Sequence, residues 1–231
     1  GLSPERQASI CGGLAILIAI FKLFSIDEMD YSDFSLREGL LHEMQQKLAL
    51  KDIRTNTIAN LSERNAIDKV HAGRVANTAD WLFIQVQKEW QLDSLDNHQL
   101  LVWAAQLHEI GLSINSSGLH KHSAYVVENS QLPGFTQQQQ TLLSCLIRFY
   151  RKKIRLEAFP QLLSLPHFQI LQLIVLLRLA VLLNQKRLSD QHQDLAVTVK
   201  GNSMLLQFPV GWLSEQTLLL ADLQQEQKYL K

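Results

Sequence analysis

The feature that most constrains this chain is a helical pattern covering more than half of it. From Asp52 to about residue 187, apolar residues recur at the three- and four-residue spacing that lines one side of a helix. Gly and Pro interrupt the pattern at a few points, which are read as loops. The pattern predicts helices at residues 52–64, 68–90, 96–110, 118–131, 136–153 and 166–187, with Asp68, Asp96 and Thr136 as N-caps. A mainly α fold follows.

The end of the chain has a different pattern. Leu195 to Lys200 and Ser203 to Phe208 are two strand-like segments joined by Gly201-Asn202, a pair typical of a two-residue hairpin turn. A last helix is expected at about residues 214–230. Because an isolated hairpin is only marginally stable in water, we expect it to pack on that helix or on the helical body.

The first residues also favour helices. Ser3-Pro4-Glu5 is a good helix start, and Gly12-Gly13 is expected to break this helix and open a second one over residues 14–24. Another helix should start at Ser35 and run towards Leu50. The segment 14–24 is apolar almost all round, and such a helix needs partners on every side. Residues 1–45 therefore resemble the end of something larger.

Composition limits the partners and the compartment. Twenty-two basic residues balance twenty-two acidic ones, so no overall field attracts nucleic acid or an anionic membrane, and a polyanion site must be a local patch. Cys11 and Cys145 lie far apart in apolar runs, which indicates reduced thiols and a cytoplasmic location. The apolar run from Gly12 to Phe21 is shorter than the ~20 residues of a membrane span, and no signal peptide is expected.

Candidate metal ligands lie in and near the segment Leu107 to Ser123. His71 falls on the inward face of the helix at 68–90, and His108 falls on the inward face of the helix at 96–110. A buried neutral imidazole needs a partner for each nitrogen. A divalent cation could be one such partner, with Glu109 as an adjacent oxygen ligand.

A complete site of this kind needs another acid from a distant helix. The helix at 166–187 places Val181 in line with Ile174 and Leu177, so this face is hydrocarbon and offers no ligand atom. We therefore expect no metal, and we interpret His71, His108 and Glu109 as the remnant of a metal site. Core histidines hydrogen-bonded to their neighbours are the structural alternative.

A second cluster is basic. The sequence places five cations within eight residues and three further basic residues in the loop-and-helix segment before them: Arg148, Arg151, Lys152, Lys153 and Arg155, with His120, Lys121 and His122. Capping of a helix C-terminus explains some of these charges, at about 0.3–1 kcal/mol each. Five exceed that need, so the cluster is a candidate for binding a phosphate polymer; the alternative is a solvated face. Phosphate-loop, dinucleotide-binding and nucleophile-elbow motifs are absent.

Several blocks in a fixed order carry a family resemblance. They are Gly12–Leu17, Ser35–Leu40, Leu107–Ser123, Asn129–Phe135 and Leu176–Asn184. Through them nearly the whole chain resembles the exopolyphosphatase/guanosine-pentaphosphate phosphohydrolase family, and it looks most similar to the bacterial exopolyphosphatase branch.

The resemblance implies a two-part enzyme. Actin-like lobes would perform Mg²⁺-dependent release of terminal phosphate, and an HD-like helical bundle with a small β-hairpin and helix would follow. On this basis residues 1–45 are the end of an actin-like lobe, 46–190 the HD-like domain and 191–231 a small α+β subdomain. Gly12 and Gly13 would lie near the nucleotide or phosphate. The family's catalytic residues correspond to none of the residues here.

The predicted function is therefore to bind inorganic polyphosphate, to feed it to the actin-like lobes and to hold a homodimer together. This part alone is expected to have no catalytic residue, metal or other cofactor. Two other hypotheses stay open: an autonomous HD-type phosphohydrolase acting on a nucleotide, and a purely structural oligomerisation module.

Overall fold

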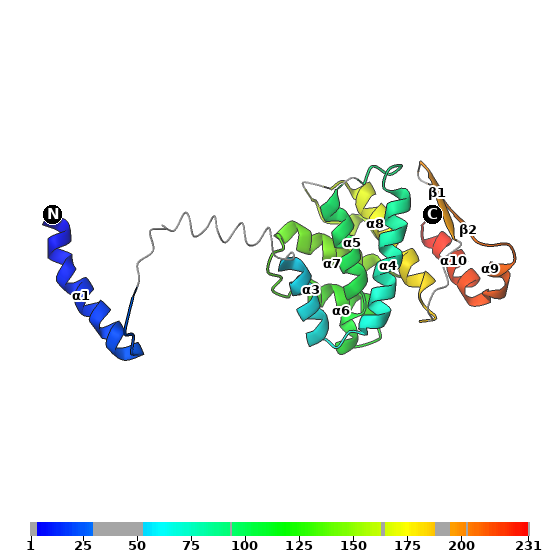
Figure 1. Cartoon of the computed structure of the whole chain (residues 1–231). Coiled ribbons are helices and arrows are strands. Elements are labelled where there is room, and N and C mark those ends of the chain that lie inside the picture. The colour runs from blue at the N-terminus through cyan, green and yellow to red at the C-terminus, as the bar shows by residue number, and fades with distance from the viewer. Residues whose placement is uncertain are drawn as a thin grey trace. The chain divides into compact units, whose positions relative to one another are not determined.

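The structure, a computed structural model, describes residues 4–29, 53–92, 94–162, 165–187, 195–201 and 203–230. The chain forms two compact units, residues 1–49 and 50–231, and Figure 1 labels their elements. The helix expected from Ser35 to Leu50 lies outside the described residues. Among the described helices, none combines the length and the apolar character needed to cross a membrane.

The first unit contains one long helix, α1 (Pro4–Phe24). It continues without interruption through Gly12 and Gly13, so the predicted break between two helices is wrong. Each glycine costs about 0.5–1 kcal/mol relative to alanine inside a helix, which the surrounding good helix formers can offset. Large apolar side chains of α1, including Leu23 and Phe24, are exposed.

The second unit contains the helical body, and the six helices predicted for it are all present. They are α3 (Ile53–Arg64), α4 (Lys69–Val86), α5 (Leu95–Leu107), α6 (Leu119–Glu128), α7 (Gln137–Phe149) and α8 (His167–Leu183), with short 3-10 turns η1 (Ile110–Ser113) and η2 (Leu156–Ala158). The mainly helical fold is therefore confirmed. Whether the arrangement is HD-like stays a prediction.

Five of these helices, α4 to α8, end three or four residues before the predicted positions. Left-handed residues close the turns after three of them: Gln91 (φ 54°), Lys152 (φ 68°) and Arg187 (φ 54°). A helix usually ends at a left-handed glycine, and these positions carry long polar side chains instead. No local stop signal in the sequence therefore marks these ends.

The helix starts follow the capping rules closely. Asp68 accepts hydrogen bonds from the backbone N–H groups of Val70 and His71 at the start of α4. Thr136 and Gln139 form a reciprocal capping box at the start of α7. Ser94, rather than the predicted Asp96, caps α5. The Asp96 carboxylate instead accepts a hydrogen bond from Arg54 Nη1 at 2.9 Å.

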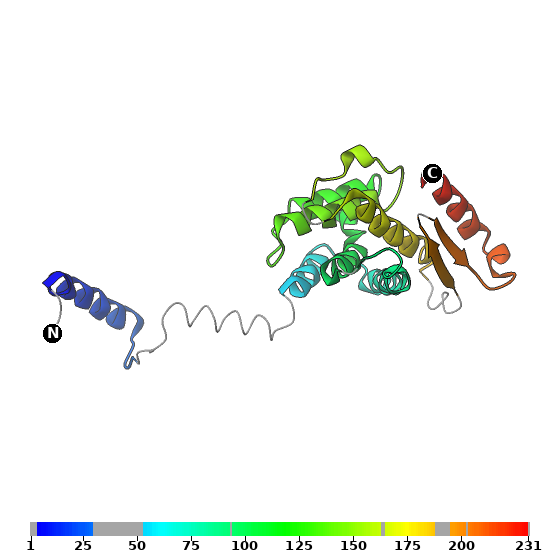
Figure 2. The same cartoon turned by 90° about the horizontal axis from the view of Figure 1, so that it is seen from above.

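The core lies where α4, α5, α7 and α8 meet, and Figures 1 and 2 show these helices side by side. Trp103 of α5 and Phe83 of α4 are among its fully buried large side chains. α8 is apolar on nearly all sides and is covered accordingly, with Ile170, Leu173 and Leu177 fully buried.

The predicted hairpin is present as β1 (Ala196–Lys200) and β2 (Ser203–Gln207), antiparallel with Lys200 opposite Ser203. It is followed by α9 (Trp212–Glu215) and α10 (Thr217–Tyr229) in place of one helix at 214–230. β1 packs against α4 and α10 against α8, at one side of the bundle (Figure 2). This contact provides the packing that an isolated hairpin lacks. The domain boundaries at 45 and 190 stay predictions.

Candidate functional site

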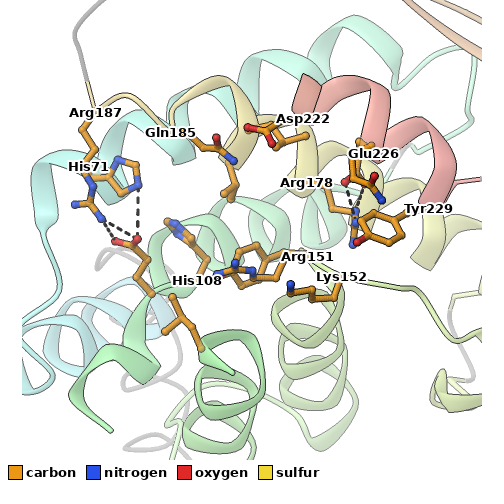
Figure 3. Close-up of a pocket in the computed structure, with 16 residues that line it drawn as sticks. His71, His108, Arg151, Lys152, Arg178, Gln185, Arg187, Asp222, Glu226 and Tyr229 are labelled. Carbon is orange, nitrogen blue, oxygen red and sulfur yellow. Dashed lines mark hydrogen bonds and ion pairs between the residues drawn. The ribbon is translucent and has the colours of Figure 1, made fainter. Parts of the chain in front are cut away.

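A cavity of about 340 Å³ opens between the helical body and α10. We call it the histidine cavity, and Figure 3 shows it. Its lining comes from α4, the end of α5, the start of α6, the turn after α7, α8 with the turn after it, and α10: His71, His108, Glu109, Leu119, Tyr150, Arg151, Lys152, Arg178, Val181, Leu182, Gln185, Arg187, Asp222, Gln225, Glu226 and Tyr229. Side chains from distant parts of the sequence thus meet here.

The structure brings together the three residues that the sequence singled out as former metal ligands. His71, His108 and Glu109 each offer one ligand atom, and these atoms lie within 4.8 Å of one another. The two imidazole centroids are 5.6 Å apart. Both rings point inward as expected, with 3% of His71 and 1% of His108 exposed.

Both histidines are neutral at pH 7 and incompletely hydrogen-bonded. Burial lowers the pKa of His108 to about 4 and also lowers that of His71. His108 Nδ1 donates to the Ala105 carbonyl at 2.7 Å, so in the neutral ring Nε2 carries the lone pair. His108 Nε2 and His71 Nδ1 are buried and have no hydrogen-bond partner. Each ring therefore has at least one nitrogen without a hydrogen bond, and His71 Nε2 lies 4.0 Å from Glu109 Oε1.

Arg187, in the turn after α8, supplies the positive charge next to this cluster. Its Nη2 donates to both Glu109 oxygens at 2.8 and 2.9 Å, and its Nη1 donates to Asp68 Oδ2 at 2.9 Å. This guanidinium thus ties the end of α8 to the start of α4 and the end of α5. Figure 3 shows Arg187 beside His71.

Val181 lines the same cavity, at the position where the sequence placed the missing acidic ligand. At this position α8 therefore offers a hydrocarbon side chain and no ligand atom. The expectation that no metal is bound stays a prediction, because no observation on the structure tests it.

A buried ion pair closes the other end of the cavity. Arg178 donates through Nε and Nη2 to the Glu226 carboxylate, and through Nη1 to the Phe149 carbonyl at 2.6 Å. Only 1% of Arg178 and 7% of Glu226 is exposed. This pair connects α8 to α10.

The basic cluster forms a second hollow of about 550 Å³, which we call the basic pocket. It is lined by Ser116, Ser117, Gly118, His120, Lys121, Arg148, Phe149, Arg151, Lys152, Lys153 and Arg155. Seven of the eight predicted basic residues are present, and only His122 is not. The α6 N-terminus also meets this pocket, with Gly118 as an N-cap that has no side-chain hydrogen bond. Its positive dipole end adds to the side-chain charges.

The two hollows adjoin, because Arg151 and Lys152 line both. Lys152 is held in the left-handed region at φ 68°, which is uncommon for a residue with a side chain. Because the two hollows share these residues, an extended anion could contact the basic pocket and reach towards the histidine cavity.

The two glycines that the sequence placed near the nucleotide or phosphate lie elsewhere. Gly12 and Gly13 lie in α1, in the other unit.

His120 is the buried group of the basic pocket, with 7% exposed and an Nδ1 that has no partner. Burial, and then repulsion from Arg148, Arg151 and the neighbouring lysines, lowers its pKa to about 4. The ring is thus neutral at pH 7 although cations surround it.

This pKa predicts a pH dependence of folding. The unfolded chain protonates His120 near pH 6.5, while the folded chain does so only near pH 4. Lowering the pH through this window therefore lowers the free energy of unfolding. Urea unfolding at several pH values between 7 and 4 should show a shallower decline for His120→Asn than for the unmodified chain. Parallel curves would contradict the assignment.

Three charged side chains that line the histidine cavity were not predicted from the sequence: Arg178, Arg187 and Glu226. Arg178 could have been found from the sequence, because a charged residue in an otherwise apolar helix requires a buried partner. Nothing local indicated which acid would be that partner.

Comparison with known families shows to which family the chain belongs. The family described as Ppx/GppA phosphatase, domain III, matches residues 53–227. The chain belongs to the Ppx/GppA phosphatase family. A second match, to the Ppx/GppA phosphatase family itself, covers residues 1–48. The resemblance to this family is thus confirmed, while the similarity to its exopolyphosphatase branch stays a prediction.

Two curated relatives carry the name guanosine-5'-triphosphate,3'-diphosphate pyrophosphatase. The protein from Pseudoalteromonas translucida is 37% identical over 230 residues, which are 99% of this chain and 46% of that protein. The protein from Photobacterium profundum is 36% identical over 226 residues, which are 98% of this chain and 45% of that protein. The chain spans about half the length of these relatives.

Proposed function

We propose that this chain is the substrate-holding region of a Ppx/GppA phosphatase, and that its basic pocket binds the phosphate chain of the substrate. Inorganic polyphosphate is the proposed ligand. The observation that carries the proposal is the convergence of six cationic side chains, the imidazole of His120 and one helix N-terminus on a single pocket.

The local charge supports this ligand. The chain as a whole has no net charge, yet the described residues that line the basic pocket include no Asp or Glu. Arg148, Arg151 and Arg155 can each form forked hydrogen bonds to phosphate oxygens, and Lys121, Lys152 and Lys153 add point charges. A polymer held at several such points stays bound after one end is shortened. The pocket suits a processive enzyme.

The names of the relatives point to a second ligand, a guanosine nucleotide with phosphate chains at its 5' and 3' positions. Both ligands offer the same chemistry to the basic pocket, namely adjacent phosphate groups. Polyphosphate matches the length of the cationic track better, because Arg151 and Lys152 extend it from the basic pocket to the histidine cavity.

The remaining parts of the proposal come from the family. Actin-like lobes would carry the hydrolytic residues, and Mg²⁺ would be bound there with the phosphate oxygens. Residues 1–45, with Gly12 and Gly13, would be the end of such a lobe. A homodimer and a cytoplasmic location complete the proposal; the free thiols of Cys11 and Cys145 agree with a reducing compartment.

Binding of fluorescent polyphosphate to the full chain tests the pocket. The triple variant Arg148→Ala/Arg151→Ala/Lys152→Ala should weaken binding by about tenfold or more and make it less dependent on salt, because fewer charges contact the polymer. A matched control removes three exposed charges elsewhere: Arg64→Ala/Lys69→Ala/Lys88→Ala. Equal losses in both variants would reject the basic pocket as the binding site. Competition with guanosine pentaphosphate then identifies the preferred ligand.

A further inference from the structure

We propose that His120 and the N-terminus of α6 form a subsite for one phosphate group inside the basic pocket, and that the imidazole takes up one proton from solvent when this group enters. The inference rests on the proposed function, because it takes phosphate as the ligand of this pocket. It adds that binding is coupled to protonation, and it names the side chain responsible. The chain should therefore hold a phosphate polymer more tightly as the pH falls.

The His120 imidazole has an unsatisfied nitrogen. The residue lines the basic pocket from the first turn of α6, it is 7% exposed, and its Nδ1 is buried without a hydrogen-bond partner. A neutral imidazole has a hydrogen on one nitrogen and a lone pair on the other, so Nδ1 carries one or the other unused. A buried polar atom in this state is costly. A ligand that reaches this nitrogen would remove that cost.

The backbone around this ring also has a donor to offer. The N-cap of α6, Gly118, provides no side-chain hydrogen bond to the first turn of this ten-residue helix. The N–H groups of Leu119 and Lys121 donate to backbone carbonyls at 3.3 and 2.7 Å, and none of the described residues accepts from the N–H of His120. The first turn of a helix carries the positive end of its dipole and binds phosphate readily. The His120 backbone and ring are thus both available to an anion.

The charges that face His120 keep its ring neutral while the pocket holds no anion. Burial, and then repulsion from Arg148 of α7, from Arg151 and Lys152 of the turn after it, and from Lys121 of α6, lowers the pKa of His120 to about 4. The charged residues that line the pocket with this ring are all cations: Lys121, Arg148, Arg151, Lys152, Lys153 and Arg155. A phosphate group placed among them neutralises this charge. The pKa of His120 therefore rises on binding, because an adjacent negative charge favours the protonated ring.

The direction of the pH effect follows from this rise in pKa. The complex binds a proton at His120 that the free chain does not bind, so affinity increases as the pH falls from the pKa of the complex towards about 4. Outside that window His120 contributes no pH dependence. A protonated imidazole donates from both nitrogens, and phosphate oxygens accept. Within the window the affinity changes by up to about tenfold per pH unit.

The test is calorimetry of trimetaphosphate binding to the full chain at several pH values between 7 and 5, in two buffers with different enthalpies of ionisation. This cyclic phosphate has no terminal group, so its own charge is constant over this range. The difference between the two buffers gives the number of protons taken up. The unmodified chain should take up close to one proton per ligand at the acidic end, and bind about tenfold more tightly there than at the neutral end.

Two variants and one spectroscopic measurement make the result specific. His120→Asn keeps a polar side chain without the titration and should lose this proton uptake and most of the pH dependence. His122→Asn is the matched control, because His122 lies two residues further along α6 and does not line the basic pocket; it should keep both. NMR of the unmodified chain with labelled histidine needs no substitution. The His120 ring should titrate at a higher pH with trimetaphosphate than without it.

The outcomes separate this inference from the proposed function. Equal proton uptake by His120→Asn and the unmodified chain overturns the inference, and so does a His120 ring that titrates at the same pH with and without ligand. In either case fluorescent polyphosphate still binds at the basic pocket and the proposed function stands. If neither polyphosphate nor trimetaphosphate binds the full chain, the proposed function and this inference both fail.

Discussion

Replacing Arg178 by methionine is expected to lower the free energy of unfolding by about 3–5 kcal/mol. The substitution leaves the Glu226 carboxylate buried without its partner, and the cost of an uncompensated buried charge dominates. It also removes the donor to the Phe149 carbonyl. Chemical denaturation of the full chain measures the loss directly.

The same substitution should loosen α10 first. Glu226 is the only buried residue among the described residues of α10, and Leu223 is only partly buried against the core, so the ion pair is the most buried contact of this helix. Tyr229 adds a contact, with the Arg178 guanidinium 5.6 Å from its ring centroid. Amide hydrogen exchange should therefore accelerate in α10 before it does in α4 or α5.

Two controls separate the buried charge from a general loss of packing. Arg178→Met/Glu226→Leu removes both charges and should recover most of the stability, because well-packed apolar replacements of buried ion pairs are often neutral. Lys69→Ala removes an exposed pair with Glu63, in which the side chains are 66% and 73% exposed, and should cost no more than about 1 kcal/mol. A small effect of Arg178→Met, comparable to that of Lys69→Ala, would contradict the prediction.

The fold was predictable where the determining interactions are local. Apolar spacing located all six helices of the body, and the Gly201-Asn202 pair located the hairpin. The caps at Asp68 and Thr136 were predicted because each side chain binds a backbone N–H three residues ahead, although Ser94, which binds Asn97 at the same spacing, was missed. The helix ends were not predicted correctly, because residues such as Lys152 and Arg187 take left-handed conformations. Neither residue type indicates such a conformation in the sequence. At Arg187, ion pairs with Asp68 and Glu109 from distant parts of the sequence hold the residue in place.

The residues of the candidate site also differ in how far the sequence predicts them, depending on whether their partners are local. Most of the basic pocket was visible because five of its cations are neighbours in the sequence. The histidine cluster was visible because each histidine lies on the inward face of its own helix. Arg187 and Glu109 are 78 residues apart, and Arg178 and Glu226 are 48 apart. No periodicity relates such positions, so only the packing of α8 against its neighbours reveals these pairs.

Substituting Gly111 is expected to be the other strongly destabilising change, for a steric reason. Gly111 lies in the 3-10 turn after α5, and a β-carbon there would be 2.4 Å from the backbone nitrogen of Ser123 and 2.8 Å from the carbonyl carbon of His122. Backbone atoms of α6 cannot move aside as a flexible side chain would. Gly111→Ala must therefore push α6 away from α5.

The displacement also breaks a buried hydrogen-bond chain. Ser123 Oγ accepts from the Gly111 N–H at 3.0 Å and donates to the His108 carbonyl at 2.8 Å. Overpacking costs about 1–3 kcal/mol, and an unsatisfied buried donor adds about 1–3 kcal/mol. Gly111→Ala should therefore lower the free energy of unfolding by about 3 kcal/mol or more in urea titrations. Gly73→Ala is the matched control, because a β-carbon inside α4 meets no atom within 4 Å and should stabilise by about 0.5–1 kcal/mol. If both substitutions stabilise the chain, α6 does not lie against Gly111 and the loop that orders His108 and His120 is placed differently.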